Sequence, residues 1–278
     1  MGTLFNKLET INPAFSKIIN SFYRKPKYSL VNLWCEIKAL KRKYGIKDKT
    51  FEELRKYHNK HLGERCFIVA TGPSLTFDDL ELIKDEYSFS MNSICKVYEK
   101  TDFRPTYYGI QDEAVFEKQL EYINKYYSNK PIFYAKGLEK KNTVNEKWIP
   151  MPVNGSYHKY DLVITKKYFA KFSDNAYHVI YDGYSITYTL IQLAVYMGFK
   201  EIYLLGCDTS YSPDPTKQHF ADNGVFDPEY KSAYDRLVSA YKEAKKYADL
   251  HNVKIINATR GGMLEVFPRK TLEEIFGE

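Results

Sequence analysis

The feature that most constrains the fold is a regular alternation of strand-like and helical segments that begins at Arg65. Short apolar runs are separated by longer amphipathic ones, which is the pattern of βαβ units. Crossovers between parallel strands are right-handed. The pattern therefore predicts an α/β, Rossmann-like, mainly parallel sheet with flanking helices. The expected strands cover 66–70, 87–92, 106–111, 131–135, 147–152, 176–181, 201–207 and 253–258, and the expected helices 76–84, 113–127, 185–198, 228–250 and 271–276.

The beginning of the chain has a different pattern, and we expect a helical appendage over 1–62 followed by a catalytic domain over 63–278. Apolar residues recur at helical spacing over 3–22. Pro26 is expected to break this pattern, and one or two Lys/Arg-rich amphipathic helices are expected over 29–61. Such helices suit an anionic membrane surface. Helices that cover the main domain or pair with another subunit have the same pattern, so these alternatives stay open.

The charge of the chain is unevenly distributed. Residues 1–65 hold 15 Lys and Arg against 6 Asp and Glu, whereas residues 66–278 hold 26 against 29, so the net charge of +6 comes entirely from the first part. This argues against a basic nucleic-acid groove across the main domain. No apolar run approaches the roughly 20 residues of a membrane span, and the N-terminus lacks the apolar core of a signal peptide. We therefore expect a cytoplasmic protein, with peripheral contact to the inner face of the membrane if the basic helices bind lipid.

The four cysteines, Cys35, Cys66, Cys95 and Cys207, are far apart in the sequence. No Cys-x-x-Cys occurs, and no His stands at a metal-ligand spacing. They are typical of small buried hydrophobic residues in a reducing compartment. The sequence thus predicts neither a disulfide framework nor a metal site.

The first expected strand ends in a turn of small polar residues, Thr71-Gly72-Pro73-Ser74. A strand, a tight loop and a helix in this order expose backbone N–H groups to a phosphate in open α/β sheets. Thr71 and Gly72 leave room for a ligand, Pro73 suits a first helical turn, and Ser74 can cap the helix or contact an anion. An ordinary strand-to-helix turn is the alternative.

Most other expected strands also end in a hydrogen-bonding residue. Ligands of such sheets bind outside the carboxyl ends of the strands, so these residues together predict a polar binding site. Neutral amides in apolar strands are costly unless paired, and they read sugars and bases without demanding a metal. The residues that we expect to bind a nucleotide, besides the turn, are Asn92, Gln111, Asp112, Gly183, Ser185 and Asp208.

A long connection follows Asp208 and runs from Thr209 to Asp227. Loops of this length within a compact domain are usually lids or binding loops. His219 lies in it, and its ordinary pKa of about 6.5 makes it the best general-base candidate. A solvent-exposed histidine without a role is the alternative. Tyr211 or Tyr184 would help to balance charge at the reacting phosphate.

Five blocks, in the same order, resemble two related groups of proteins. One is the bacterial family 42 sialyltransferases, and the other is the broader MptE-like domain, named for a 6-hydroxymethylpterin pyrophosphokinase and often found in surface-polysaccharide loci. The resemblance extends over about 65–262. The blocks are 70–75, 90–93, 182–185, 198–208 and 257–259.

The resemblance to the sialyltransferases implies a site for a CMP-activated sugar and a histidine base. Gly72, Pro73 and Ser74 match the turn of that family, and Asn92 matches its amide after the second strand. Gln111 replaces an Asn, Ser185 falls where a helix-start hydroxyl contacts the nucleotide, and His219 falls near the catalytic His. Thr71 stands where that family has Asn, and neither its Thr-Ser-Gly nor its His-x-x-x-His pattern is present.

The resemblance to the pyrophosphokinase implies acidic residues that hold Mg²⁺ and ATP phosphates. Asp112, Asp182 and Asp208 could supply them, but amide-containing pairs, Asn92-Ser93 and Gln111-Asp112, replace two of the acidic motifs of that enzyme. The expected function is therefore a glycosyltransferase of bacterial surface-polysaccharide assembly that requires no cofactor. Its expected partners are a nucleotide-sugar donor, with a CMP-activated, sialic-acid-like sugar as the best single choice, and a glycan or lipid-linked glycan acceptor. The alternatives are a Mg²⁺-dependent pyrophosphokinase and a non-catalytic nucleotide- or glycan-binding protein.

Overall fold

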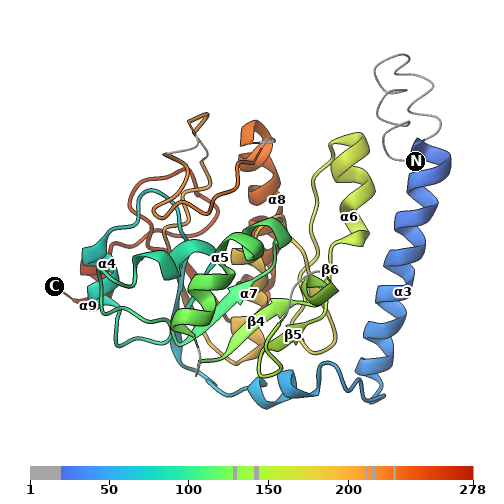
Figure 1. The fold of residues 1–278 in the computed structure, drawn as a ribbon, viewed down its shortest axis with the longest axis horizontal. Coiled ribbons are helices and arrows are strands. Elements are labelled where there is room, and N and C mark those ends of the chain that lie inside the picture. The colour runs from blue at the N-terminus through green and yellow to red at the C-terminus, as the bar shows by residue number, and fades with distance from the viewer. Residues whose placement is uncertain are drawn as a thin grey trace.

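The computed structural model describes residues 20–127, 130–140, 144–210, 212–214, 217–227 and 230–277. These residues build a seven-stranded sheet in the order β5-β4-β3-β2-β1-β8-β9, and each neighbouring pair is parallel (Figure 1). The predicted parallel α/β fold is thus confirmed. The strands are β1 (Arg65–Val69), β2 (Ser88–Met91), β3 (Tyr107–Ile110), β4 (Ile132–Ala135), β5 (Ile149–Met151), β8 (Glu201–Leu205) and β9 (Lys254–Asn257).

Helices cover both faces of the sheet. Cys66 and Ile68 of β1 point into a core with α7 and α8, while Phe67 and Val69 point into a second core with α4, α5 and α9. Side chains of a strand alternate between faces, and both sets are apolar because both faces are covered. All five expected helices are present, as α4 (Phe77–Leu82), α5 (Glu113–Tyr126), α7 (Ile186–Tyr196), α8 (Ala233–His251) and α9 (Leu272–Phe276); the short helices η3 (Asn92–Val97), η4 (Leu138–Lys140) and η7 (Tyr230–Ser232) lie between them.

The strand order contains one reversal of direction. The chain runs outward from β1 through β2 to β5, and it then returns to place β8 and β9 on the other side of β1. Adjacent crossovers on opposite sides of a strand leave a crevice at its carboxyl end, where ligands of open α/β sheets bind. The end of β1 beside β8 is therefore the place where a ligand of this fold would bind.

The predicted strand over 176–181 is only partly correct. Its last two residues form β7 (Ile180–Tyr181), which pairs with β6 (Val153–Asn154) in a separate two-stranded sheet. The preceding residues form a turn in which Oδ1 of Asn175 accepts a bond of 3.1 Å from the His178 amide, so a side chain replaces the partners that a strand would need. Between β6 and β7 lie two unpredicted helices, α6 (Ser156–Tyr160) and η5 (Asp161–Thr165).

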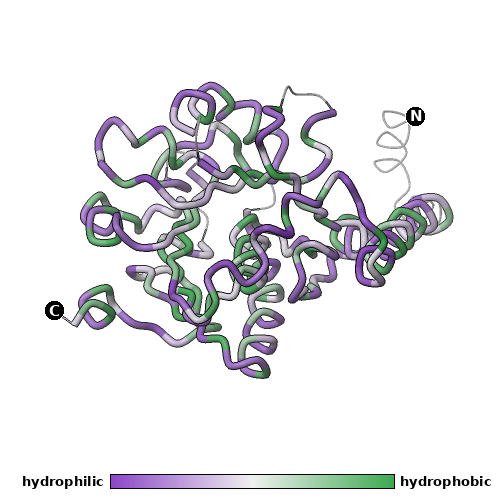
Figure 2. The backbone as a smooth tube through the Cα atoms, turned by 90° about the horizontal axis from the view of Figure 1, so that it is seen from below, coloured by the Kyte–Doolittle hydropathy of each residue, from purple (hydrophilic) through white to green (hydrophobic). Residues whose placement is uncertain are grey.

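Residues 20–43 form a helix that lies at one edge of the molecule (Figure 1). The expected break at Pro26 is wrong, because η1 (Asn20–Arg24) continues directly into α3 (Lys25–Lys43). Proline is tolerated in a first helical turn, where its missing N–H needs no partner. Hydrophobic segments recur along α3 (Figure 2). The helix expected over 3–22 lies mostly outside the described residues, and 44–61 contains only η2 (Glu52–Tyr57).

None of the helices in the described residues is both long and apolar enough to cross a membrane.

Candidate functional site

A polar pocket lies at the carboxyl ends of β1 and β8, where the strand order reverses. The ends of these two strands, the end of β2, the first turn of α7 and the loop after β8 all contribute to it, and α8 adds one leucine and one tyrosine. We call it the switch-point pocket. It is lined by 70–73, 91–92, 185–187, 206–210, 218–219, Leu237 and Tyr241.

Gly72 permits the close contact between the turn after β1 and the end of β8. A β-carbon at this position would lie far inside van der Waals distance of Oδ2 of Asp208 and the carbonyl oxygen of Gly206. The Gly72 amide donates to the Gly206 carbonyl at 2.9 Å. The space that Gly72 leaves is therefore filled by the chain's own backbone and carboxylate, and its predicted contact with a ligand stays a prediction.

The carboxylate of Asp208 binds the other end of this turn. Its Oδ2 accepts from the Ser74 hydroxyl at 2.8 Å and from the Ser74 amide at 3.4 Å. Burial raises the pKa of Asp208, and the bonds from Ser74 partly offset this increase. Asp208 reaches the pocket as predicted. The Ser74 donors that were expected to contact a phosphate point instead to a carboxylate, so Ser74 holds the turn in shape.

Asn92 enters the pocket in a strained conformation with an unused acceptor. Its φ is 51°, in the left-handed region, and it follows β2 at the start of η3. The backbone carbonyl accepts from the Tyr108 hydroxyl at 2.6 Å, which holds the backbone in place. The side-chain Oδ1 is buried and has no hydrogen-bond partner among the described residues. A buried orphan acceptor beside a cavity indicates a missing donor.

The first turn of α7 lines the same pocket with Ser185, Ile186 and Thr187. Ser185 is the N-cap, and its hydroxyl accepts from the Thr187 amide at 3.1 Å. The positive end of a helix dipole at this place favours an anion. Ser185 thus lines the pocket and caps α7, and its predicted contact with a nucleotide stays a prediction.

His219 borders the pocket with a defined ring orientation. Oδ1 of Asn223 accepts from the Val225 amide at 2.9 Å, so its Nδ2 must face Nε2 of His219, 2.9 Å away. Nε2 therefore accepts, and the ring is neutral with its proton on Nδ1. Burial lowers the pKa of His219, while Asp222 and a bond to the Thr71 backbone partly oppose this effect. At neutral pH the ring can take up a proton.

The loop that carries His219 is bound to the domain at several points. The Phe220 amide donates to the carbonyl of Thr71 at 2.8 Å, and Ser93 donates to the carbonyl of Ala221. Gln119 of α5 donates to the carbonyl of Asn223 at 3.0 Å. The loop thus forms a wall of the pocket that is fixed to β1, η3 and α5.

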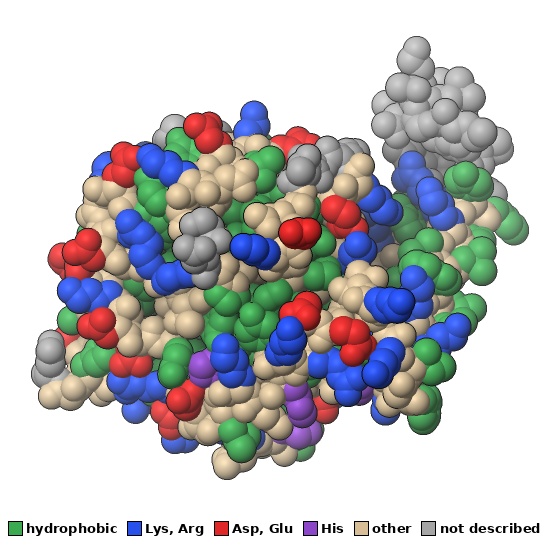
Figure 3. All heavy atoms as spheres, turned by 60° about the horizontal axis from the view of Figure 1, so that its bottom comes forward, with side chains coloured by type: hydrophobic (Ala, Val, Ile, Leu, Met, Phe, Trp, Pro, Cys, Tyr) green, Lys and Arg blue, Asp and Glu red, His purple; other side chains and the backbone are tan. Residues whose placement is uncertain are grey.

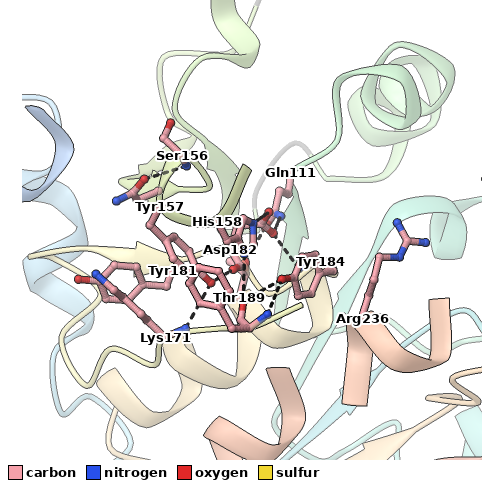
Figure 4. A network of polar contacts seen from close by, with 12 residues as sticks. Gln111, Ser156, Tyr157, His158, Lys171, Tyr181, Asp182, Tyr184, Thr189 and Arg236 are labelled. Atoms are coloured by element: carbon pink, nitrogen blue, oxygen red, sulfur yellow. Dashed lines mark hydrogen bonds and ion pairs between the residues drawn. The ribbon is translucent and has the colours of Figure 1, made fainter. Parts of the chain in front are cut away.

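Gln111 does not reach the switch-point pocket and belongs to a second polar cluster. Its Nε2 donates to Oδ1 of Asp182 at 2.8 Å, and its Oε1 accepts from Thr189 at 2.5 Å. Oδ2 of Asp182 lies 3.3 Å from Nε2 of His158, whose ring stacks on Tyr184 at 4.5 Å (Figure 4). These five residues are the Asp182 network.

The Asp182 network fixes the loop that leads into α7. Asp182 Oδ1 also accepts from the Tyr184 amide at 3.2 Å, and Tyr184 has a left-handed φ of 68°. The Tyr184 hydroxyl donates to the Phe169 carbonyl at 2.7 Å, and burial raises its pKa to about 12. A β-carbon on Gly183 would overlap the ring of Tyr188. Gly183 and Tyr184, predicted as ligand-binding and catalytic, thus lie outside the pocket lining and shape the turn before Ser185.

The three aspartates considered as Mg²⁺ ligands lie apart from one another. Asp112 is the N-cap of α5 and accepts from the Val115 amide at 3.0 Å, so its side chain has a structural role there. Asp182 belongs to its own network, and Asp208 alone lines the pocket. The described residues contain no group of three or more His, Cys, Asp or Glu side chains able to hold a metal. Mg²⁺ held mainly by substrate phosphates needs one or two carboxylates, and only Asp208 is in place for this.

The sequence did not single out His158 and Thr187. His158 lies in the short helix α6, which carried no recognisable pattern, and only the fold brings it beside Asp182. Thr187 is two residues beyond the predicted Ser185. Because it lies in the first turn of the same predicted helix, it could have been expected to line the same pocket. Tyr211 lies outside the described residues, so its predicted role stays a prediction.

A parallel sheet with a polar pocket at its switch point defines the chain as a Rossmann-like α/β protein. The chain belongs to the MptE-like family: the family model described as 6-hydroxymethylpterin diphosphokinase MptE-like matches residues 39–214. The resemblance noted from the sequence is thereby confirmed. Comparison with curated proteins gives no significant match.

Two solved structures are similar to the chain at low identity. The MAf glycosyltransferase from Magnetospirillum magneticum AMB-1 superposes with a TM-score of 0.48 and 18% identity over 77% of this chain and 34% of that one. This chain therefore spans about a third of the length of that protein. The sialyltransferase CstII from Campylobacter jejuni, solved with the substrate analogue cytidine-5'-monophosphate, superposes with a TM-score of 0.45 and 15% identity over 75% of this chain and 85% of that one.

Proposed function

We propose that the chain is a glycosyltransferase that binds a nucleotide-sugar in the switch-point pocket and transfers its sugar to a glycan acceptor. The observation that carries this proposal is the buried, unpartnered Oδ1 of Asn92 beside the first turn of α7. A neutral acceptor next to helix-start donors suits a ligand that has both N–H or O–H donors and an anionic phosphate. A nucleotide-sugar has both. A CMP-activated acidic sugar is the donor that we favour, because the exocyclic amine of cytosine supplies such a donor.

The proposed reaction is an inverting displacement. Nε2 of His219 takes the proton of the acceptor hydroxyl as the oxygen attacks the anomeric carbon of the sugar. The bond between that carbon and the phosphate oxygen breaks, and the nucleotide leaves with the bonding electron pair. For this step the acceptor hydroxyl must take the place that Nδ2 of Asn223 now occupies, 2.9 Å from Nε2.

The leaving phosphate gains negative charge, which the first turn of α7 can balance. Ser185, Ile186 and Thr187 of that turn line the pocket. Donors that are already oriented stabilise developing charge without reorganisation. The acceptor that we propose is a lipid-linked or free glycan of surface-polysaccharide assembly, which agrees with the family resemblance noted from the sequence.

The test compares two asparagines that share a left-handed backbone. Asn92 has a φ of 51° in the pocket, and Asn252 has a φ of 54° at the end of α8. We expect Asn92→Ala to raise the KM for a CMP-sugar by about tenfold, the value of one hydrogen bond of roughly 1.4 kcal/mol. Asn252→Ala carries the same backbone cost and should leave KM unchanged. Equal effects on KM from the two variants, or no turnover of any nucleotide-sugar by the wild type, would contradict the proposal.

A second candidate function is transfer of a pyrophosphate group from ATP to an alcohol. The description of the family model and the position of Asp208 in the pocket favour it. In that case ATP with Mg²⁺ would be consumed in the presence of a pterin alcohol, and EDTA would stop the reaction. Binding of a nucleotide without any turnover would instead support a non-catalytic binding protein.

A further inference from the structure

Helix α3 is docked on the body of the protein through its polar side. Glu36 accepts from the Tyr181 hydroxyl at 3.0 Å and pairs with Lys171 at 3.1 Å. Asn32 accepts from Asn154 at 3.0 Å. Asn32 and Glu36 are four residues apart, so their contacts lie on one side of the helix. An amphipathic helix on a globular domain normally turns its apolar side inward, and α3 does the reverse over this stretch.

Arg42 anchors the end of the same side. Its guanidinium donates to the His178 carbonyl at 3.0 Å and 2.5 Å and pairs with Asp48 at 2.9 Å. Burial lowers the pKa of Arg42, and the bond with Asp48 opposes this change. The orientation of α3 is therefore fixed by specific polar contacts.

The opposite side of α3 and the residue after its end carry large hydrophobic side chains. Their exposed fractions range from 43% to 78%, and their spacing of three to four residues places them on one side of the helix. From Leu30 to Tyr44 this side is about 21 Å long, from the rise of about 1.5 Å per residue of a helix. We call it the outer face of α3. Its members are Leu30, Leu33, Trp34, Ile37, Leu40 and Tyr44.

The outer face is accompanied by positive charge. The sequence of α3 holds six Lys or Arg and a single acidic residue, Glu36, which is turned inward. The ammonium of Lys38 lies 3.6 Å above the ring of Trp34. Figure 3 shows hydrophobic and basic side chains side by side along the edge that α3 forms.

We propose that the outer face of α3 lies on an anionic membrane surface. Hydrophobic side chains enter the boundary between headgroups and acyl chains, while the lysines beside them meet lipid phosphates. A second copy of the chain is a poorer partner, because pairing two outer faces brings lysines of like charge together. The proposal does not depend on the reaction that the pocket catalyses.

The two tryptophans of the chain provide a direct readout. Trp34 is 57% exposed on the outer face, whereas Trp148 is 7% exposed inside the domain. A change of tryptophan emission when vesicles are added therefore reports on Trp34. The full chain would be mixed with vesicles of phosphatidylcholine alone, or with vesicles that also contain phosphatidylglycerol. We expect a blue shift and co-sedimentation with the anionic vesicles only, with both reduced at high salt.

Matched variants test whether vesicle binding requires the outer face of α3 or only exposed hydrophobic side chains anywhere on the surface. Leu30→Ser with Leu33→Ser and Ile37→Ser keeps the Trp34 reporter and should abolish the shift and the co-sedimentation. Leu62→Ser with Leu250→Ser changes residues that are 70% and 73% exposed elsewhere and should leave both unchanged. Lys41→Glu with Lys43→Glu should weaken binding to the anionic vesicles, and circular dichroism checks that each variant is folded.

Two results would overturn the proposal. One is a wild-type protein that neither shifts its emission nor sediments with anionic vesicles at low salt. The other is a concentration-dependent blue shift without lipid, together with a dimer in analytical ultracentrifugation that the Leu30, Leu33 and Ile37 changes dissociate. That second result would assign the outer face to a second copy of the chain.

Discussion

The switch-point pocket and the Asp182 network each contain residues that the sequence placed in a single site. In the network, the Asp182 carboxylate interacts with three groups, from Gln111, Tyr184 and His158. In the pocket, Oδ1 of Asn92 has no partner among the described residues. A polar cluster in which each hydrogen-bonding group has a partner stabilises the fold. A cluster with an unpaired acceptor can bind a ligand instead.

The two regions depend on each other through one turn of chain. The Asp182 network fixes the left-handed Tyr184, and the next residue, Ser185, begins α7 and lines the pocket. The network therefore affects the pocket indirectly, because it sets the backbone position of Ser185 at the start of α7. Changes in the pocket should alter binding and rate, whereas changes in the network should first alter stability.

The largest effect is expected from His219→Ala. Loss of a general base costs about 10²- to 10⁴-fold in kcat, while donor binding, measured by calorimetry, should stay within about twofold because the ring faces the acceptor. His251→Ala, on the surface beyond the sheet, is the control and should leave kcat unchanged. Equal kcat values for wild type and His219→Ala would exclude the base role.

The same residue predicts the pH dependence. Burial lowers the pKa of His219 below its ordinary value of about 6.5. The neutral base is thus fully present at pH 7, and kcat/KM should fall as the pH drops through the lowered pKa. His219 favours the folded state above the pKa of the unfolded chain, and that stability is lost as pH falls through the folded pKa. Asn223→Ala removes the donor to Nε2, so it should move the acid limb to higher pH.

The next largest effect is expected from Gly72→Ala. The new β-carbon would overlap Asp208 and Gly206, so we expect a loss of about 3 kcal/mol in the free energy of unfolding, together with loss of nucleotide binding. Gly137→Ala is the control, since its β-carbon would meet no atom within 4 Å. It should cost only the backbone strain of its positive φ and should keep binding. If Gly72→Ala bound a nucleotide with the affinity of the wild type, the turn after β1 would not be part of the nucleotide site.

Asp182→Ala tests the network. It leaves the amide groups of Gln111 and Tyr184 without their acceptor, and we expect a loss of about 2 kcal/mol in urea unfolding. The pH limb of the remaining activity should stay in place, because His219 keeps its surroundings. A shift of that limb would show that the network also sets the pKa of the base. A stability equal to that of the wild type would show that the network does not stabilise the fold.

The smallest effect separates capping from binding at α7. Ser185→Ala removes an N-cap, and so does Thr271→Ala at the start of α9. Each should cost about 1 kcal/mol of stability. Only Ser185→Ala should also weaken nucleotide binding, by several-fold in isothermal titration. Equal nucleotide affinities in the two variants would show that Ser185 caps α7 and does not contact the nucleotide.

The sheet could be predicted from the sequence because each strand and each helix start depends on residues that are close together in the chain. Strand runs such as 201–207 and the N-cap Ser185 are set by residues within a few positions, and the order of blocks then fixes the parallel topology. Thr71, Gly72, Asn92, Ser185, Asp208 and His219 could be placed near one edge by the same reasoning.

Long-range partners were beyond that reasoning. Whether Asp208 meets a ligand or Ser74, and whether Gln111 meets a ligand or Asp182, depends on contacts over 134 and 71 positions of the chain. His158 was missed for the same reason. The inverted docking of α3 was also invisible, because a helical pattern shows which side is apolar and not which side faces the protein.

We propose above all that the switch-point pocket binds a nucleotide-sugar through neutral groups. A thermal-shift panel of CMP, CDP, UDP, GDP and ATP, each with and without Mg²⁺, tests it most directly on the wild type and Asn92→Ala. We predict that CMP raises the melting temperature of the wild type equally with and without Mg²⁺, and that Asn92→Ala loses most of this increase. An increase with ATP alone, only when Mg²⁺ is present and unchanged in Asn92→Ala, would contradict the account.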